Sequence, residues 1–189
     1  MVFAEVTGCV HGQRKTSLSR RPRIGADDWR RLAERVSEVA RHLAGRGVRM
    51  AYHHHMGTVI ETEDEIDRLM AMTGDEVGLL LDTGHLCYAG GDPARVAERH
   101  GARIVHVHCK DFRAEVLAQA RAQDWSFLDA VLAGVFTVPG DGGVDYRGLL
   151  PILARFGYRG WLVVEAEQDP AKAHPLSYAR KGHDALLEA

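Results

Sequence analysis

The chain has 189 residues, 46% of them hydrophobic, which is enough for one domain with a sizeable buried core. Its formal net charge of -2 provides no basic surface for nucleic acid, and it lacks the run of about 18 apolar residues that a membrane span needs. Three scattered cysteines do not indicate a disulfide framework, so we expect a cytoplasmic protein.

Five short apolar runs are predicted to be β-strands, and none alternates cleanly between apolar and polar residues. Strands that are apolar throughout are typical of parallel sheets, which are covered on both faces. In chain order, the predicted strands are Val2–Val6, Val48–Tyr52, Val77–Leu81, Ile104–Val107 and Trp161–Val164.

Helical patterns follow these strands. We expect Asp27 or Asp28 to cap the first helix, Thr62 and Glu65 to form a capping box, and Asp92 to cap a helix that begins at Pro93. The predicted helices reach from these caps to His42, Met72 and His100, and two more span Tyr146–Phe156 and Leu176–Leu187. The longer connections, His11–Ala26 and Asp111–Val144, are predicted to be loops, which are often functional at this length.

The alternation of strands and helices predicts βαβ units and a parallel sheet. A closed (β/α)8 barrel needs eight strands and typically about 250 residues. We therefore expect an incomplete TIM barrel with about five of its eight βα units, forming a single domain over residues 1–189 that is truncated at its N-terminus.

Each predicted strand ends in side chains that can bind metal or move protons. Parallel α/β folds bind their ligands at the carboxyl ends of the strands. In chain order, these side chains are Glu5, then His53, His54 and His55, then Asp82 and His85, then His106, His108, Lys110 and Asp111, and finally Glu165 and Glu167.

A single aspartate at a strand end is commonly a helix cap, and a single histidine beside an apolar run is commonly structural. Five such endings in succession favour a shared metal site over coincidence. Carboxylates mixed with imidazoles suit Mn²⁺, Co²⁺, Mg²⁺ or Zn²⁺. Cys109 alternates with His108 along its strand, so we expect it to point away from the site.

Several segments resemble the inosose dehydratase family, within the superfamily of xylose-isomerase-like barrels. The resemblance covers nearly the whole chain. The segments that carry it include AYHHHMGTVIET (51–62), residues 80–93 with DTGH, IVHVHCKD (104–111), residues 127–146 and GWLVVEAEQDP (160–170).

This resemblance implies a lyase that removes water from 2-keto-myo-inositol to give a trihydroxycyclohexane-1,2-dione in inositol catabolism. It implies Mn²⁺ or Co²⁺ and a glutathione requirement. Carried over by position, the metal ligands fall on Asp82, His108 and Glu165. The superfamily's fourth ligand, a glutamate, falls near His53, and His55 or Glu5 are the alternatives.

Acid–base groups work best with a pKa near ambient pH, which favours histidine as the proton carrier. The candidates are His54, His55 and His85. Lys110 could bind or protonate a substrate oxygen, and Asp111 and Glu167 would orient these groups. We expect a small polyol ketone as the substrate, with no nucleic-acid or membrane partner, and a homo-oligomer as one option.

Three alternatives remain open at this point. A sugar isomerase or epimerase would use the same cluster but return the proton instead of expelling hydroxide. An endonuclease of the same barrel type would need a positive phosphate-binding surface, which the charge does not indicate. A truncated chain could also be an inactive metal-binding fragment, because a sheet with two open edges leaves part of its core uncovered.

Overall fold

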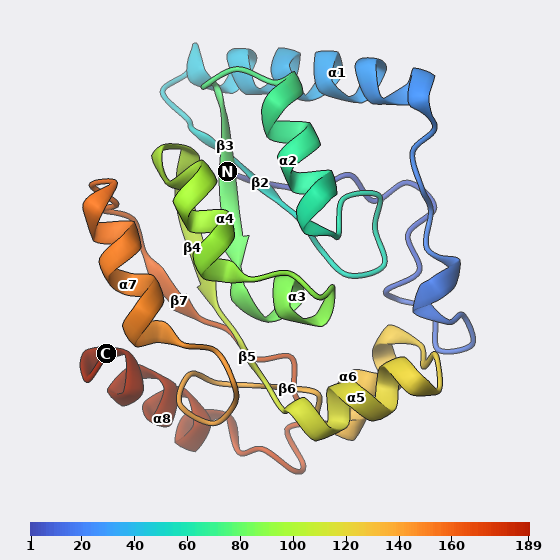
Figure 1. The fold of residues 1–189 in the computed structure, drawn as a ribbon, viewed down its shortest axis with the longest axis vertical. Helices are drawn as coiled ribbons and strands as arrows, with labels where there is room; N and C mark the ends of the chain where they lie inside the picture. The colour runs from blue at the N-terminus through green and yellow to red at the C-terminus, as the bar shows by residue number, and fades with distance from the viewer.

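The computed structural model describes all residues from 1 to 189 as a parallel sheet with helices packed along its outer face (Figure 1). The strand order is β1-β2-β3-β4-β7, and every neighbouring pair is parallel. The strands are β1 Val2–Phe3, β2 Met50–His53, β3 Val77–Asp82, β4 Ile104–Cys109 and β7 Leu162–Val164. The predicted parallel α/β fold with five barrel strands is confirmed.

Four helices cover the outer face of the sheet and share one core with it: α1 Ala26–Ala44, α2 Glu63–Met72, α4 Pro93–His100 and α7 Tyr146–Arg155. The other helices are α3 Thr83–Tyr88, α5 Ala114–Ala122, α6 Phe127–Ala133 and α8 Pro175–Leu187, with short 3-10 turns at Leu18–Arg20 and Gly101–Arg103. None of them combines the length and apolar character that a membrane span would need.

Alternation along the strands separates the core from the site. The side chains that face the helices are buried, and they include Met50, Tyr52, Leu79, Leu81, Val107 and Cys109. Neighbouring strand residues point to the opposite face of a sheet. His53, Asp82 and His108 therefore lie together on the inner face, and Cys109 points into the core as predicted.

Two of the three predicted helix starts are confirmed. Thr62 forms a capping box with Glu65, and Asp92 caps α4 with Pro93 in its first turn. The third prediction is wrong, because α1 begins after Gly25 without a side-chain cap. Asp27 and Asp28 lie inside its first turn instead, where their charge favours the positive end of the helix dipole.

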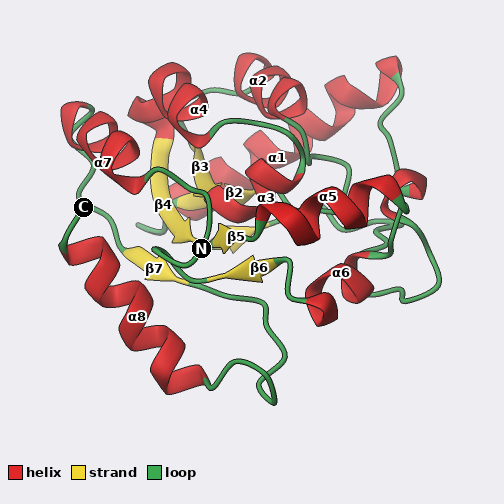
Figure 2. Ribbon diagram, turned by 60° about the horizontal axis from the view of Figure 1, so that its bottom comes forward, coloured by secondary structure: helices red, strands yellow, loops and turns green.

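The segment 111–144 corrects the prediction of a long loop. It contains α5, α6 and a small antiparallel pair, β5 Asp111–Phe112 with β6 Phe136–Thr137. These elements lie together on one side of the molecule (Figures 1 and 2) and form a second core, in which Phe127 packs with residues from earlier in the chain such as Val10. Two-residue strands and helices of seven to nine residues are too short to give a clear periodic pattern.

The first strand is shorter than predicted. Only Val2 and Phe3 pair with β2, and the chain then leaves the sheet. The side chain of Glu5 accepts a hydrogen bond from the backbone N–H of Thr7 at 2.8 Å, which turns the chain locally. Glu5 is therefore not at a strand end, although the sequence places it there.

Candidate active site

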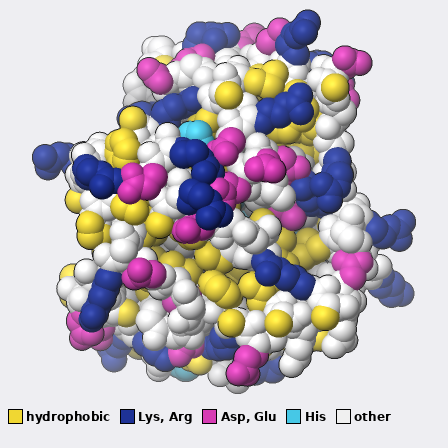
Figure 3. All heavy atoms as spheres, viewed as in Figure 1, with side chains coloured by type: hydrophobic (Ala, Val, Ile, Leu, Met, Phe, Trp, Pro, Cys, Tyr) yellow, Lys and Arg dark blue, Asp and Glu magenta, His cyan; other side chains and the backbone are white.

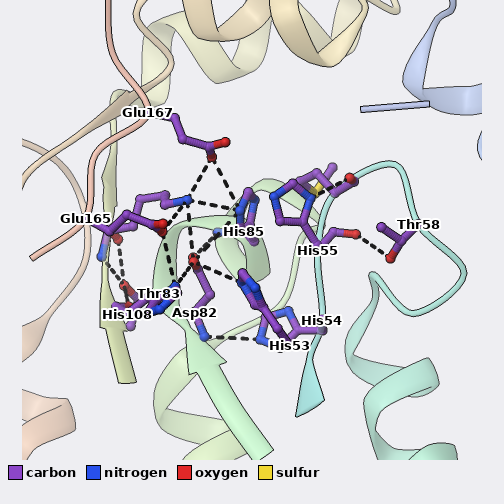
Figure 4. Close-up of polar contacts among 12 residues, drawn as sticks. His53, His54, His55, Thr58, Asp82, Thr83, His85, His108, Glu165 and Glu167 are labelled. Carbon is purple, nitrogen blue, oxygen red and sulfur yellow. Dashed lines mark hydrogen bonds and ion pairs between the residues drawn. The ribbon is translucent and has the colours of Figure 1, made fainter. Parts of the chain in front are cut away.

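Asp82 is the centre of a buried group of titratable side chains (Figure 4). It ends β3 and is completely buried. Its Oδ1 accepts a hydrogen bond from the N–H of His85 at 2.9 Å and so caps α3. Its Oδ2 faces four cationic or neutral nitrogen groups: His108 Nδ1 at 3.3 Å, His53 Nε2 at 3.5 Å, Lys110 Nζ at 3.5 Å and His85 Nε2 at 3.8 Å.

Strand register brings the three residues expected to bind metal to one place. Asp82 pairs directly with His108 across β3 and β4. Beyond β7, the backbone N–H of Glu165 donates to the carbonyl of Cys109 at 3.3 Å, and Glu165 Oε2 comes within 3.2 Å of His108 Nδ1. The ligand atoms of Asp82, His108 and Glu165 all lie within 4.8 Å of one another, close enough to share one cation.

The donor set fits a divalent metal. His53 Nε2 is buried without a hydrogen-bond partner and lies 3.5 Å from Asp82 Oδ2, as expected of an atom that a cation would satisfy. His53 also lies within 4.8 Å of Asp82 and His85 by its ligand atom, which favours it as the fourth ligand. Glu5 belongs to none of these groups and lines a separate cavity of about 340 Å³ beside α1.

Lys110 balances the negative charge of the site. Its side chain is buried, and its Nζ lies 2.7 Å from Glu167 Oε2, 2.8 Å from Glu165 Oε2 and 3.0 Å from His85 Nε2. Burial alone would lower the pKa of Lys110, but the surrounding carboxylates, Asp82 foremost, raise it above its ordinary value. Lys110 therefore stays an ammonium group at neutral pH.

The residues that we expect to bind metal are held as charged partners. Burial opposes the charged form of His108, but hydrogen bonds to Asp82 and Glu165 raise the pKa of His108 to about 9. The pKa of Glu165 shifts in the opposite direction. Burial opposes ionisation of this carboxyl group, but His108 and Lys110 lower its pKa to about 2. A metal bound here would replace the proton on His108.

A second group, His55, His85 and Glu167, has ligand atoms within 4.8 Å of one another and lies beside the first. Burial lowers the pKa of His55 to about 4 and the pKa of His85 well below its ordinary value. Their rings are 3.9 Å apart, and His55 Nδ1 is bonded to the carbonyl of Met56 at 2.8 Å. These two imidazoles are therefore neutral at pH 7.

His54 does not join the other candidates. Its ring is fully buried, and its Nε2 accepts a hydrogen bond from the backbone N–H of Asp82 at 3.2 Å. Burial lowers the pKa of His54 to about 3. The geometry gives His54 a positioning role behind Asp82, because consecutive residues of an extended chain point to opposite sides. The sequence run His53–His55 already predicted this alternation, because it continues a strand.

The DTGH segment also positions Lys110. The Thr83 hydroxyl accepts from the N–H of Lys110 at 3.0 Å and also lies 2.9 Å from the hydroxyl of Tyr146. A Cβ atom added to Gly84 would lie only 2.5 to 2.8 Å from the Cγ, Cβ and Cδ atoms of Lys110. The lysine stem thus passes directly over Gly84, and a larger residue there would displace it.

Two aromatic residues that sequence reasoning missed complete the wall around His85. The ring of Phe136 lies 5.3 Å from His85 edge-on, and that of Phe127 lies 5.8 Å away. Lys110 Nζ lies 5.1 Å from the Phe136 ring centre, within the range of a cation–π contact. Both phenylalanines come from the segment 111–144, for which the signals of function were its length and the family resemblance of residues 127–146.

Asp111 has a different role from the predicted one. Its Oδ1 accepts from the N–H groups of Phe112 at 2.8 Å and Val144 at 2.9 Å. A Cβ on Gly142 would come within 2.4 Å of the same carboxylate oxygen. Asp111 therefore anchors the loop 139–144, and these hydrogen bonds do not reach the histidines or Lys110. Glu167 contacts both Lys110 and His85, two of the groups that it is predicted to orient.

A cavity of about 600 Å³ lies near the amino ends of the strands, away from the titratable group. Arg49, Ile104 and Tyr158 are among its lining residues. Only His106 of the strand-end candidates borders it. The ring of His106 meets that of His108 edge-on at 5.3 Å, so His106 packs against a candidate ligand.

A parallel α/β sheet with its polar side chains gathered at the carboxyl ends of the strands is the arrangement of a (β/α)-barrel enzyme. Residues 3–189 match the family model of the xylose isomerase-like TIM barrel, and the chain belongs to this family.

Two named relatives show which proteins of the family the chain is similar to. The chain is 53% identical over 186 residues to the rhizopine catabolism protein MocC of Rhizobium meliloti, covering 98% of this chain and 57% of that protein. It is 46% identical over 194 residues to the inosose dehydratase of Glaesserella parasuis serovar 5 (strain SH0165), covering 98% of this chain and 65% of the relative. The chain thus spans less than two thirds of the length of either relative.

Among solved structures, the chain resembles the crystal structure of IOLI protein with a bound zinc atom. The TM-score is 0.62 at 18% sequence identity, and the match covers 82% of this chain and 55% of that one. At this identity the likeness supports the fold.

Proposed function

We propose that this chain carries the metal-binding and proton-transfer residues of a hydro-lyase. Its substrate would be 2-keto-myo-inositol, and its product a trihydroxycyclohexane-1,2-dione of inositol catabolism, formed in the cytoplasm. The observation that carries the proposal is the meeting of Asp82, His108 and Glu165 beside two neutral imidazoles and a buried ammonium group. The 46% identity to an inosose dehydratase supports the choice of substrate.

Asp82, His108, Glu165 and His53 would hold a divalent cation, with Mn²⁺ or Co²⁺ as our first candidates. When bound, the cation supplies Lewis-acid polarisation of the ketone oxygen. The IOLI structure, which has a similar fold, holds a zinc atom, and this supports a divalent metal in a protein of this fold.

Proton removal from the hydroxyl-bearing carbon next to the ketone falls to His55 or His85. Both are neutral at pH 7, and a base must be unprotonated to act. Glu167 Oε2 lies 3.4 Å from His85 Nε2, close enough to stabilise the imidazolium that forms there. His54 lies behind Asp82 instead, with a fully buried ring whose Nε2 accepts from the backbone N–H of Asp82.

Lys110 stabilises negative charge on the substrate. Its raised pKa makes it a weak proton donor but a permanent cation, so we assign it the binding of the developing oxyanion. The proton taken from carbon is returned to the departing β-hydroxyl, which leaves as water. The enol that remains tautomerises to the dione, and the overall change is the loss of one water molecule.

The test is product analysis with Mn²⁺-loaded protein and 2-keto-myo-inositol. We expect a product lighter than the substrate by one water, and no turnover by Asp82→Ala. The exposed and unbonded Asp75 gives a matched control, because Asp75→Ala removes the same group away from the site. A product of unchanged mass would identify an isomerase or epimerase, and no turnover by the wild-type chain would favour the inactive-fragment alternative.

The relationship to MocC favours a second candidate substrate. That relative is named for rhizopine catabolism and is 53% identical, so a compound of rhizopine catabolism is the alternative for the same chemistry. Parallel assays on both compounds decide between them by kcat/KM. Glutathione and a homo-oligomer stay predictions, which assays with and without glutathione and light scattering can check.

A further inference from the structure

His11, a residue with no role so far, lies against the proton-transfer group. Its ring is 5.0 Å from that of His55 and meets Phe127 edge-on at 6.4 Å. His55 in turn is 3.9 Å from His85, which contacts Asp82. The three imidazoles thus form a row, and His11 lies at the end farthest from Asp82.

The backbone at His11 is held in place by the turn that follows the histidine run. The N–H of Val10 donates to the carbonyl of Gly57 at 2.9 Å, and Val10 is buried in the second core. Gly57 has a φ of 75°, and a Cβ there would lie 2.8 Å from the backbone nitrogen of His11. The N–H of Gly57 donates to Glu61 at 2.7 Å, and Glu61 pairs with the buried Arg21 at 3.3 Å.

His11 also carries a polar atom that the protein does not satisfy. Its Nδ1 is buried and has no hydrogen-bond partner. An unpaired buried polar atom costs free energy that a ligand can recover by bonding to it. His55 differs in this respect, because its Nδ1 is bonded to the Met56 carbonyl.

We propose that His11 is a substrate-contacting residue that hydrogen-bonds a ring hydroxyl of a cyclic polyol ketone, remote from the carbonyl. The inference rests on the proposed function and deepens it by assigning the far side of the substrate site. A polyol ring carries hydroxyls around its whole edge, so a site that binds only the ketone end would leave the others without protein partners. An imidazole can donate to or accept from a hydroxyl, and the fixed loop holds it ready.

The experiment measures binding of 2-keto-myo-inositol by calorimetry to Mn²⁺-loaded protein, together with KM and kcat. His11→Phe keeps the ring shape but removes both nitrogens. His11→Asn and His11→Gln restore an amide nitrogen near the places of Nδ1 and Nε2. His42→Asn, on an exposed part of α1, is the matched control.

We expect His11→Phe to weaken ketone binding and to raise KM by roughly tenfold with kcat nearly unchanged, the pattern of lost ground-state binding. Mn²⁺ affinity should be unchanged, and either the Asn or the Gln variant should recover most of the loss. If the Phe variant fails to bind Mn²⁺, His11→Ala replaces it with the same expectations.

Two results would overturn this inference without affecting the proposed function. The first is a Phe variant that binds the ketone as the wild type does. The second is an equal loss of ketone binding in the Phe, Asn and Gln variants, with neither amide recovering it. A wild-type protein that binds Mn²⁺ but not the ketone overturns the proposed function, and this inference with it.

Discussion

The two carboxylate oxygens of Asp82 have different partners. One oxygen caps α3, and the other faces His108, His53 and Lys110. The cap fixes the side chain in one orientation, so the second oxygen needs no reordering when a cation binds. The helix-cap interpretation of this residue is therefore confirmed, and it is compatible with the proposed role of Asp82 as a metal ligand.

Gly84 offers a test of the role of Lys110 at the same scale. We predict that Gly84→Ala lowers kcat by at least about tenfold, which corresponds to about 1.4 kcal/mol in the barrier, because the new methyl group displaces the lysine stem. Mn²⁺ binding should survive, since Lys110 is not among the proposed ligands. Gly45→Ala is the control, as a Cβ there meets only ordinary contacts of 3.6 Å.

A double-mutant cycle separates this effect from general damage. Lys110→Ala removes the stem, so adding Gly84→Ala to it should cost little more activity. Additive losses would show that Gly84 acts on something other than Lys110, contrary to the prediction.

At the residue scale, the sequence predicted which residues would lie close together but not the separate role of each. Strand ends of a parallel sheet converge by topology, which is why Asp82, His108 and Glu165 could be grouped from their positions. The separation of His54 from its neighbours followed from strand alternation. The packing of Phe127 and Phe136 on His85 depends on the fold of the segment 111–144, and no local pattern predicts it.

At the scale of elements, α2 and α4 are joined on their exposed faces by a charged network. Glu63 Oε1 accepts from Arg95 Nε at 2.6 Å, and Glu63 Oε2 accepts from the backbone N–H of Asp92 at 3.1 Å, at the start of α4. Arg99 also bonds Glu63. Figure 3 shows acidic and basic side chains interspersed on this face, including over these two helices. The network therefore fixes α4 beside α2, and through it the start of β4.

This network predicts a pH dependence of stability. Hydrogen bonds from Arg95 above all lower the pKa of Glu63 from 4.5 to about 2. A carboxylate with a lowered pKa in the folded state stabilises it fully above the unfolded value and loses that contribution as the pH falls through the folded value. We expect Glu63→Gln to be less stable than the wild type at pH 7, and the gap to shrink between about pH 5 and pH 2.

Urea unfolding at several pH values measures the gap. Glu98→Gln is the control, because Glu98 pairs with Arg155 on an open surface and its removal should matter little. A gap between the wild type and Glu63→Gln that stays constant down to pH 3 would contradict the assignment.

The elements that the sequence predicted best were those with long periodic patterns or side-chain caps. α2 and α4 begin where their caps place them, and β3 fills the whole predicted run. The elements that were missed, α3, α5 and α6, have six to nine residues each. Such short helices are stabilised by packing, here around Phe127 and Phe136, more than by their own sequence.

At the scale of the whole molecule, the proposed metal site ties four strands together. Its ligands lie at or next to the carboxyl ends of β2, β3, β4 and β7, which are widely separated in the chain. A cation that binds only the folded state stabilises it by mass action, by about 2.7 kcal/mol at a concentration 100 times its Kd. Metal binding and fold stability should therefore rise and fall together.

The most direct measurement is the binding of Mn²⁺ to the wild-type chain, followed by calorimetry and by the shift in unfolding temperature. The account predicts that one ion binds and raises the unfolding temperature. It also predicts that Asp82→Ala, His108→Ala and Glu165→Gln each lose most of the affinity and the shift, while Asp75→Ala keeps both. Unchanged binding in all three site variants would contradict the central claim that these residues share one cation.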